Sequence, residues 1–403
     1  MKRRTGMGDA GWGARKTSFG TQVPAPRTPH PGPRIAIVHD WLTGMRGGEK
    51  VLEAICELYP GADLFTLVRL KGTVSPAIEQ RAVRTSFVQR LPRPGRFYRH
   101  YLPLYPAAVE MFDLDGYDLV ISSSHCAVKS VITRGDARHI CYCHSPMRYA
   151  WDQFGAYFGP DQVGRWPSRT LRPILAAMAR WDASTAGRVD AYLANSQYVA
   201  GRIRRYYNRG STVVYPPVDT EFFRPDPMRA QSGSEALVVS ALVPYKRLDL
   251  AIDASRLAQV RLRIVGQGPE EARLRRVAAD GDVEFLGWRS DDEVRDLYRS
   301  AAVVLLPGVE DFGMVPVEAQ ACGTPVVALA EGGARETVED AVTGALVPRP
   351  DAAMFADAIR RVIETPLDRR AIRRQAERFS AARFKAAFSA AVDDAPLQAA
   401  TAP

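Results

Sequence analysis

The stretch Gly308-Val-Glu-Asp-Phe-Gly-Met-Val-Pro-Val-Glu-Ala-Gln-Ala-Cys-Gly-Thr-Pro-Val-Val327 decides the fold. It follows residues 301–306, an apolar run that predicts a buried strand because polar residues do not alternate within it. Pro307 ends that strand, and Gly323 ends a short helix before a second strand begins. The stretch is therefore predicted to form a strand, a loop, a helix and a strand, which is the unit of a parallel sheet.

Two acidic residues of this stretch are candidates for a binding site. Glu310 lies in the loop, and Glu318 lies in what we expect to be the first turn of the helix. The free N–H groups and partial positive charge of such a helix end suit an anion such as a phosphate. Acidic groups beside an anion site would suit a sugar attached to a phosphate. The residues alone leave a structural alternative open, in which Glu310 is solvated and Glu318 caps the helix.

Length and composition describe an ordinary globular protein. The chain has 403 residues, which is comfortable for two domains, with 46% hydrophobic and 25% charged residues. Much of the net charge of +9 comes from the first 33 residues and from 81–100, which argues against a uniform nucleic-acid-binding surface. No apolar run approaches the length needed to span a bilayer.

The cysteines and the start of the chain indicate a reducing compartment. The cysteine count is odd, and most of them stand in apolar runs, as buried free thiols do: Cys56, Cys126, Cys141, Cys143 and Cys322. Residues 1–33 lack the apolar core of a secretory signal and are rich in Gly, Pro and basic residues. We therefore expect a disordered basic tail and a cytoplasmic protein.

Strands and helices alternate in both halves of the chain, which predicts an α/β fold. We expect two Rossmann-like, doubly wound domains that face each other across a cleft. The predicted parts are a first domain over 34–215, a proline-rich linker over 216–234, a second domain over 235–380, and 381–403, which holds a helix crossing back to the first domain and a tail.

Residues 81–112 interleave basic and aromatic side chains. This pattern suits an anionic membrane surface, where rings lie at headgroup level and cations meet lipid phosphate. We expect such peripheral contact with the inner membrane through 81–105. A plain basic surface remains the alternative, and stacking on nucleotides is the least favoured reading. Prolines in the segment argue against one long amphipathic helix.

Two further places in the first half follow predicted strands. Gly47 and Gly48 stand in a loop between the strand 34–40 and a helix beginning at Lys50, and glycines there let backbone N–H groups approach an anion. His144 ends another strand, where α/β sheets place their ligands. A structural histidine in a turn is the alternative for His144.

With these residues laid out, the chain resembles the family 4 glycosyltransferases of the GT-B fold from Arg34 to about residue 394. The most specific element is Glu310-Asp-Phe-Gly-Met-Val-Pro-Val-Glu318, which matches the E-x7-E motif of that family. Supporting elements are Gly47-Gly48-Glu49, Val-Pro-Tyr-Lys246, Val-Gly-Gln-Gly-Pro269, Phe-Leu-Gly287 and Tyr-Pro-Pro-Val-Asp219. Within the family, 141–151 and 240–247 look most like bacterial mannosyltransferases of polysaccharide and O-antigen assembly.

The resemblance implies roles for particular residues. Glu310, His144 and Lys246 would be catalytic, with Glu310 holding the donor sugar, His144 lying over it and Lys246 neutralising the diphosphate. Glu318 would bind the ribose. The implied donor-binding set is Gly47, Gly48, Lys246, Arg247, Leu286, Gly287, Glu310, Phe312, Gly313, Met314, Val315 and Glu318. Many family members have an arginine where Ala241 stands, and Arg247 is our candidate for that second positive charge.

The resemblance also implies an activity. We expect a hexose, mannose from GDP-mannose, to pass with retention of configuration to a lipid-linked glycan or polysaccharide precursor, without a metal ion or other cofactor and without nucleic acid as a partner. Fixed cations and a helix end would stabilise the departing diphosphate. Two other classes stay open: a sugar-nucleotide epimerase of the same fold, and a non-catalytic protein that binds nucleotide sugars.

Overall fold

A computed structural model describes residues 32–226 and 234–395. Most of the predicted tail 1–33, residues 227–233 of the predicted linker and the last eight residues of the predicted 381–403 segment lie outside the described residues. A division of the chain at Pro33 leaves the described residues from Arg34 on as one compact unit. The division does not test the boundaries at 215 and 235, which stay predictions.

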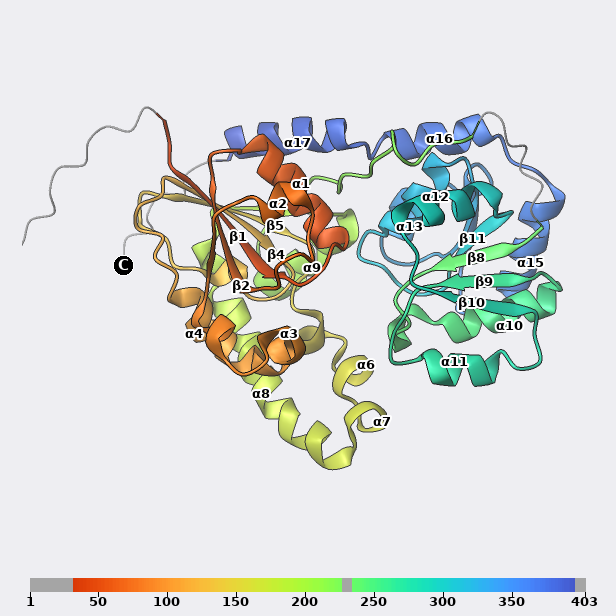
Figure 1. The fold of residues 1–403 in the computed structure, drawn as a ribbon, viewed down its shortest axis with the longest axis horizontal. Coiled ribbons are helices and arrows are strands. Elements are labelled where there is room, and N and C mark those ends of the chain that lie inside the picture. Colours follow the sequence, from red (N-terminus) through yellow and green to blue (C-terminus); the bar gives the residue numbers. More distant parts are fainter. Residues whose placement is uncertain (1–31, 227–233, 396–403) are drawn as a thin grey trace, which may run out of the picture. The chain divides into compact units, whose positions relative to one another are not determined.

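The first half of this unit is built on a seven-stranded parallel sheet with the strand order β3-β2-β1-β4-β5-β6-β7 (Figure 1). Its central strands are buried along almost their whole length, as their runs of apolar residues predict. The order reverses between β1 and β4, so the loops after these two strands diverge and leave room for a ligand. The strands are β1 (Ile35–Leu42), β2 (Asp63–Arg69), β3 (Val83–Thr85), β4 (Leu119–Ser124), β5 (Arg138–Cys143), β6 (Ala191–Ala194) and β7 (Thr212–Val213).

Helices connect these strands, and the first of them begins earlier than predicted. Helix α1 starts at Gly47, so Gly47 and Gly48 lie in its first turn and not in a loop. The reason is a capping arrangement, because the Arg46 N–H donates to the Glu49 carboxylate at 3.1 Å. The α-helices here are α1 (Gly47–Leu58), α2 (Pro76–Glu79), α3 (Pro94–Phe97), α4 (Tyr105–Glu110), α5 (Arg148–Trp151), α6 (Phe154–Phe158), α7 (Pro160–Val163), α8 (Arg165–Ser184) and α9 (Gln197–Tyr207).

The basic and aromatic segment 81–112 folds as several short elements, as its prolines predict. Besides β3, α3 and α4 it contains the 3-10 helices η1 (Phe87–Arg90) and η2 (Tyr98–Leu104). Tyr98 and Tyr105 are buried against Trp41, so these rings belong to the core and not to a headgroup-level surface. Six of the thirteen exposed residues of the segment are basic: Arg84, Arg90, Arg93, Arg96, Arg99 and His100.

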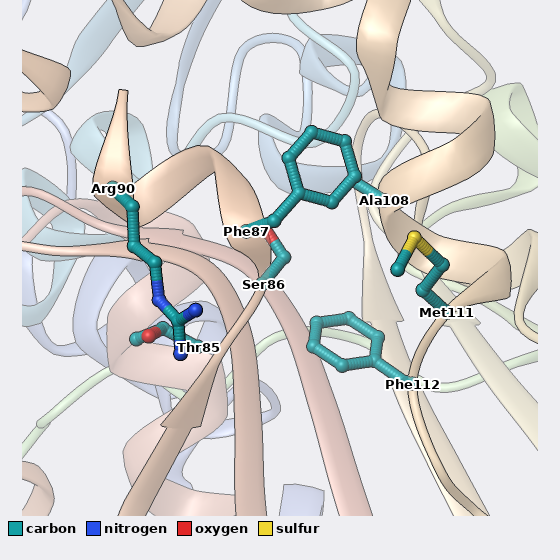
Figure 2. A pocket seen from close by; sticks show the side chains of 7 residues that line it. All are labelled: Thr85, Ser86, Phe87, Arg90, Ala108, Met111 and Phe112. Carbon is teal, nitrogen blue, oxygen red and sulfur yellow. The ribbon is translucent and has the colours of Figure 1, made fainter. Parts of the chain in front are cut away.

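A pocket of about 230 Å³ opens beside η1 and α4 (Figure 2). Phe87, Phe112 and Met111 give it an apolar wall, and Arg90 stands at its edge. Its full lining is Thr85, Ser86, Phe87, Arg90, Ala108, Met111 and Phe112. Two apolar side chains of this region face the solvent, since Met111 is 70% exposed and Leu104 is 41% exposed.

The second half is built on a six-stranded parallel sheet with the order β10-β9-β8-β11-β12-β13 (Figure 1). Here the order reverses between β8 and β11. The strands are β8 (Ala236–Val239), β9 (Leu262–Val265), β10 (Val283–Gly287), β11 (Val303–Leu306), β12 (Val326–Leu329) and β13 (Gly344–Val347). The helices are α10 (Leu248–Ala258), α11 (Glu271–Val277), α12 (Asp291–Ser300), α13 (Met314–Ala321), α14 (Ala334–Thr337) and α15 (Ala352–Glu364).

The last two helices, α16 (Arg369–Glu377) and α17 (Ala381–Asp393), contact different halves. Helix α16 packs on the second half, where Arg373 donates to the Ala321 carbonyl at 2.8 Å. Helix α17 packs on the first half. Its Phe384 and Phe388 lie in the cluster that contains the β5 residue Tyr142, and the ring centroids of Tyr142 and Phe384 are 5.8 Å apart. The last helix therefore has the apolar contacts that a crossing back to the first half requires.

Candidate functional site

The loops after β8 and β11 carry a pair of opposite charges at the switch point of the second sheet. Lys246, which follows β8, forms an ion pair with Glu310, which follows β11. Both side chains are largely buried, so water screens this pair less than a surface pair. The sequence predicted that these two residues share a site, and the structure brings them together.

Glycines bring these loops close to each other. A Cβ at Gly308 would lie 2.6 Å from the Tyr245 carbonyl oxygen and 2.7 Å from the Lys246 Cα, so only glycine fits there. On the other side of the loop, a Cβ at Gly333 would lie 2.2 Å from the Phe312 carbonyl oxygen. The backbone around Glu310 is therefore held between two close backbone contacts.

Helix α13 begins directly after this loop. Gly313 precedes it with a φ of +88°, a conformation that favours glycine, and Met314 and Val315 form its first turn. Backbone N–H groups of a first turn have no partner within the helix, so they are available to an anion. The Phe312 side chain is buried on Tyr215 and Phe379, which leaves its backbone as the part that can meet a ligand.

Glu318 lies one turn further along α13 than predicted. The helix begins at Met314, so Glu318 is in its second turn and does not cap the first. Its side chain is buried, and its two oxygens accept hydrogen bonds from the Tyr298 hydroxyl at 3.1 Å and from Lys50 Nζ at 3.3 Å. The sequence reasoning missed Lys50, because nothing in its local pattern shows that α1 reaches α13.

Lys50 itself lies between two carboxylates of the second half. It contacts Asp291 at 3.7 Å in addition to Glu318. Burial lowers the pKa of Lys50, but the two carboxylates outweigh this and hold the pKa above its ordinary value. Lys50 is therefore a cation that ties the first turns of α1 to the second half.

The two glycines at the start of α1 lie beside predicted residues from other elements. A Cβ at Gly47 would lie 3.0 Å from the Met314 sulfur. A Cβ at Gly48 would lie 3.9 Å from the His144 ring and 3.8 Å from the His39 ring. The lack of side chains at both positions lets α1 approach α13 and the histidines closely. The predicted role of these glycines at an anion stays a prediction.

Three histidines gather at the ends of the central strands of the first sheet. The ring centroids of His39, His125 and His144 lie between 5.8 and 6.4 Å apart. Burial lowers the pKa of His39 and of His125 to about 3, and it holds the pKa of His144 well below its ordinary value. The three imidazoles are therefore neutral at pH 7. The sequence singled out only His144.

The loop after β4 that carries His125 is fixed by Asp40. The Asp40 carboxylate accepts hydrogen bonds from four successive backbone N–H groups, those of residues 125–128, at 2.7 to 3.1 Å. Burial raises the pKa of Asp40, and these backbone hydrogen bonds act against that rise. The four bonds to one carboxyl group fix the conformation of the loop.

Arg148 is a second residue that the sequence reasoning missed as part of the site. It forms an ion pair with Asp311, the residue next to Glu310, and Arg202 pairs with the other oxygen of Asp311 at 3.2 Å. The Arg148 guanidinium also lies 5.9 Å from the centre of the Tyr245 ring. Burial alone would lower the pKa of Arg148, but Asp311 and Glu310 together with two tyrosines outweigh burial and raise it, so Arg148 is a cation at the Glu310 loop.

The remaining predicted residues lie at the edges of this arrangement. Arg247 is half-exposed and pairs with Asp249 at 3.2 Å. Gly287 ends β10, where its carbonyl accepts from the Gly266 N–H at 2.8 Å, and Leu286 belongs to the same apolar cluster as Met314 and Val315. Among the described residues, no three His, Cys, Asp or Glu side chains are grouped so that they could hold a metal ion. All five cysteines are free and buried, as predicted.

The search for a membrane-spanning element gives a negative result. Within residues 32–226 and 234–395, no helix combines the length and the apolar character that crossing a bilayer demands.

Solved structures show the same fold. HepE of Anabaena, crystallised with UDP, superposes with a TM-score of 0.65 over 89% of this chain and 99% of that protein, at 21% identity. The lipopolysaccharide outer core galactosyltransferase WaaB superposes with a TM-score of 0.60 over 89% and 99% of the two chains, at 18% identity. The two parallel sheets of this chain thus form the GT-B fold, as predicted.

Curated relatives match parts of the chain at higher identity. The D-inositol 3-phosphate glycosyltransferase of Frankia alni is 35% identical over 234 residues, which are 50% of this chain and 54% of the relative. The protein of that name from Mycobacterium tuberculosis is 38% identical over 169 residues, which are 36% of this chain and 35% of the relative. The matches therefore span about half or less of the length of these relatives.

Two family models match adjacent parts of the chain. The model for Glycosyltransferase Family 4 matches residues 23–222, and the model for glycosyl transferases group 1 matches residues 219–379. Together they take in both sheets, the Lys246–Glu310 pair and the histidine cluster. The chain belongs to glycosyltransferase family 4.

Proposed function

We propose that this protein transfers a sugar from a nucleoside-diphosphate sugar to an acceptor hydroxyl, with retention of configuration at the anomeric carbon. The observation that carries the proposal is the Lys246–Glu310 pair between β8 and β11, beside the first turn of α13. A cation and free N–H groups suit a diphosphate, and a carboxylate next to them suits the hydroxyls of the attached sugar.

Each predicted residue then has a role in the proposed complex. Lys246 neutralises the diphosphate, aided by the backbone N–H groups at Gly47 and Gly48. Glu310 and the backbone of 312–315 hold the donor sugar, and His144 lies over it. Glu318 holds the ribose, with Leu286 and Gly287 near the base. Arg247 stays our candidate for the second positive charge, and Arg148 competes with it because it lies closer to the Glu310 loop.

Donor binding must replace two contacts of the free protein. The diphosphate and the sugar would separate Lys246 from Glu310, since each charge gains a new partner. The ribose would compete with Lys50 for the Glu318 carboxylate. The exchange favours binding because each buried charge keeps a hydrogen-bond partner throughout.

The proposed reaction needs no nucleophile from the protein. The acceptor oxygen attacks the anomeric carbon on the face that the diphosphate leaves. The bond from that carbon to the diphosphate oxygen breaks, and the proton of the acceptor passes to the leaving phosphate. Lys246 and the α13 N–H groups stabilise the charge that grows on the diphosphate, which lowers the barrier more than it tightens ground-state binding.

The finer features of the proposal concern the substrates. We propose mannose from GDP-mannose as the donor, on the likeness of 141–151 and 240–247 to mannosyltransferases. UDP-glucose is the competing donor, because HepE was also solved with it. We propose a lipid-linked glycan as the acceptor, approached at an anionic membrane through the exposed cations of 81–105, with Leu104 adding exposed apolar contact. We expect no metal requirement.

A donor screen tests the proposal. The purified full-length chain is incubated with GDP-mannose, UDP-glucose and other nucleotide sugars, with and without membranes, and released nucleotide is measured. We expect release from one donor class, faster with membranes, and loss of release in Lys246→Ala. Lys385→Ala is the matched control, because Lys385 also pairs with a glutamate, Glu57, at 2.6 Å but outside the site. No release from any donor would refute the activity, and isomerised donor without transfer would indicate an epimerase.

A further inference from the structure

A chain of hydrogen bonds runs across the three central strands of the first sheet and ends at His144. The Ser123 hydroxyl oxygen on β4 lies 3.0 Å from His39 Nδ1 and 2.8 Å from His144 Nε2. His39 and Ser123 are paired residues in the register of β1 and β4, so the sheet itself fixes their contact. The last member of the chain is the histidine that the proposed function places over the donor sugar.

The number of available protons limits the directions in which the hydrogen bonds among His39, Ser123 and His144 can run. His39 and His144 are both neutral, because burial lowers their pKa values. A neutral imidazole carries one N–H donor and one bare acceptor nitrogen, and Ser123 has a single hydroxyl proton. If Ser123 gives that proton to one histidine, the other histidine can only complete the chain by donating to the serine oxygen.

The second ring nitrogen of His39 decides which groups donate in these hydrogen bonds. Within the described part of the chain, His39 Nε2 is buried and has no hydrogen-bond partner. An orphaned buried N–H is rarer in native proteins than an acceptor left bare. His39 therefore carries its proton on Nδ1 and donates it to Ser123, and Ser123 donates its own proton to His144 Nε2.

We propose that His39 and Ser123 are positioning residues that hold His144 in the tautomer with its proton on Nδ1. His144 then offers an N–H donor to a hydroxyl oxygen of the donor sugar, and it does not accept a hydrogen bond from that hydroxyl. This inference rests on the proposed function for the identity of the ligand. The direction of the hydrogen-bond chain does not depend on the ligand, because it rests on the contacts of Ser123, the unpartnered His39 Nε2 and the neutral state of the two histidines.

The same strand supplies a matched control. Ser122, the neighbour of Ser123 on β4, contacts His139 Nε2 at 2.8 Å, and both of these side chains are also buried. Side chains alternate between the two faces of a strand, so Ser122 points away from the histidine cluster. Ser122→Ala thus removes one serine–histidine contact away from the site, whereas Ser123→Ala removes the two contacts that lead to His144.

Nuclear magnetic resonance of the full chain labelled with ¹⁵N-histidine tests the tautomer directly. The chain has six histidines, so their ring signals can be resolved, and His144→Gln assigns that of His144. We expect the His144 proton on Nδ1 in the wild type and in Ser123→Thr, and a shift towards Nε2–H in Ser123→Ala but not in Ser122→Ala. A wild-type His144 protonated on Nε2 would overturn the proposal.

Sugar transfer gives the second readout. We expect Ser123→Ala to lower kcat about tenfold with a smaller change in KM, about the rate equivalent of one hydrogen bond. Ser123→Thr keeps the hydroxyl and should restore kcat to within about threefold. Ser122→Ala should leave kcat unchanged, and an equal loss from both alanine variants would overturn the positioning role. If the wild type transfers no sugar, the proposed function fails, while the tautomer measurement still decides the hydrogen-bond chain.

Discussion

The two sheets present different chemistry at equivalent places. At the switch point of the second sheet, the loops after β8 and β11 carry the charged pair Lys246 and Glu310. At the switch point of the first sheet, β1 and the loop after β4 carry His39 and His125, which are neutral because they are buried. One topology thus supplies fixed charge on one side and uncharged hydrogen-bonding groups on the other. We infer that charge binds the donor, and that neutral imidazoles orient it.

The largest effect should come from the charged side. Glu310→Ala should lower kcat by about 10²–10³-fold, because a preorganised polar contact to the reacting sugar is worth that much. Glu310→Gln should recover part of the loss, since it keeps an acceptor. Steady-state transfer kinetics measure both, with Glu57→Ala as the control for losing a lysine–glutamate pair. A fall in kcat of less than tenfold would mean that Glu310 does not contact the reacting sugar.

The next largest effect separates the three cations near the donor. Lys246→Ala should lower kcat/KM by about 10²-fold, since it removes the charge closest to the proposed diphosphate. Arg247→Ala should cost much less if the Asp249 pair keeps that side chain outside the site. Equal losses at 246 and 247 would show that Arg247 supplies the second charge, as the sequence predicted, and would remove Arg148 from that role.

A smaller effect should appear in binding and not in turnover. Glu318→Ala should weaken the binding of the free nucleoside diphosphate about tenfold, the equivalent of one hydrogen bond to a charged group, with little change in kcat. Isothermal titration measures the affinity. Tyr298→Phe is the control, because it removes only the hydroxyl that supports the carboxylate. A large fall in kcat with unchanged affinity would exchange the proposed roles of Glu318 and Glu310.

The last effect concerns the neutral side and is a pH dependence of the free energy of unfolding, not of activity. The pKa of His39 falls from 6.5 to about 3 on folding, so the unfolded chain binds more protons between these values and stability falls as pH drops below 6.5. His39→Gln should remove up to about 1.4 kcal/mol of this loss per pH unit. Denaturant unfolding at pH 7 and pH 5 measures the difference between the two proteins.

The wild type must be compared with His39→Gln because the pKa of a second group, Glu49, shifts in the opposite direction on folding. Burial raises the pKa of Glu49 to about 7, so its contribution to stability is lost as pH rises from about 4.5 towards 7. Both proteins contain Glu49, so its contribution to the pH dependence of stability cancels in the difference between them. His100→Gln is the control at an exposed histidine. Identical slopes for the wild type and His39→Gln would mean that His39 is not buried as a neutral group.

Much of the fold could be predicted because the signals are local. The strand, helix and strand predicted for residues 301–327 are present as β11, α13 and β12, in the predicted order. The α1 start was wrong by three residues, because the Arg46–Glu49 capping contact extends the helix through two glycines. The turn of Glu318 was wrong for a similar reason, since Gly313 lets α13 begin at Met314.

The aromatic residues of 81–112 show a second limit of local patterns. Alternating cations and rings look alike whether the rings point outward or inward. In the structure Trp41, which is about 60 residues away in the chain, takes Tyr98 and Tyr105 into the core and leaves the arginines outside. Only the tertiary packing decides between those arrangements.

The sequence by itself determined the two parallel sheets and the family, because strand ends and motif spacing are properties of short segments. The resemblance also assigned Lys246 and Glu310 to one site, but it did not predict the ion pair between them. Only the tertiary structure placed Lys50 on Glu318, Arg148 on Asp311 and Ser123 between His39 and His144. These contacts join residues from different strands and from both halves of the chain. Sheet register and the packing of one half on the other set them, and no local run of residues encodes either.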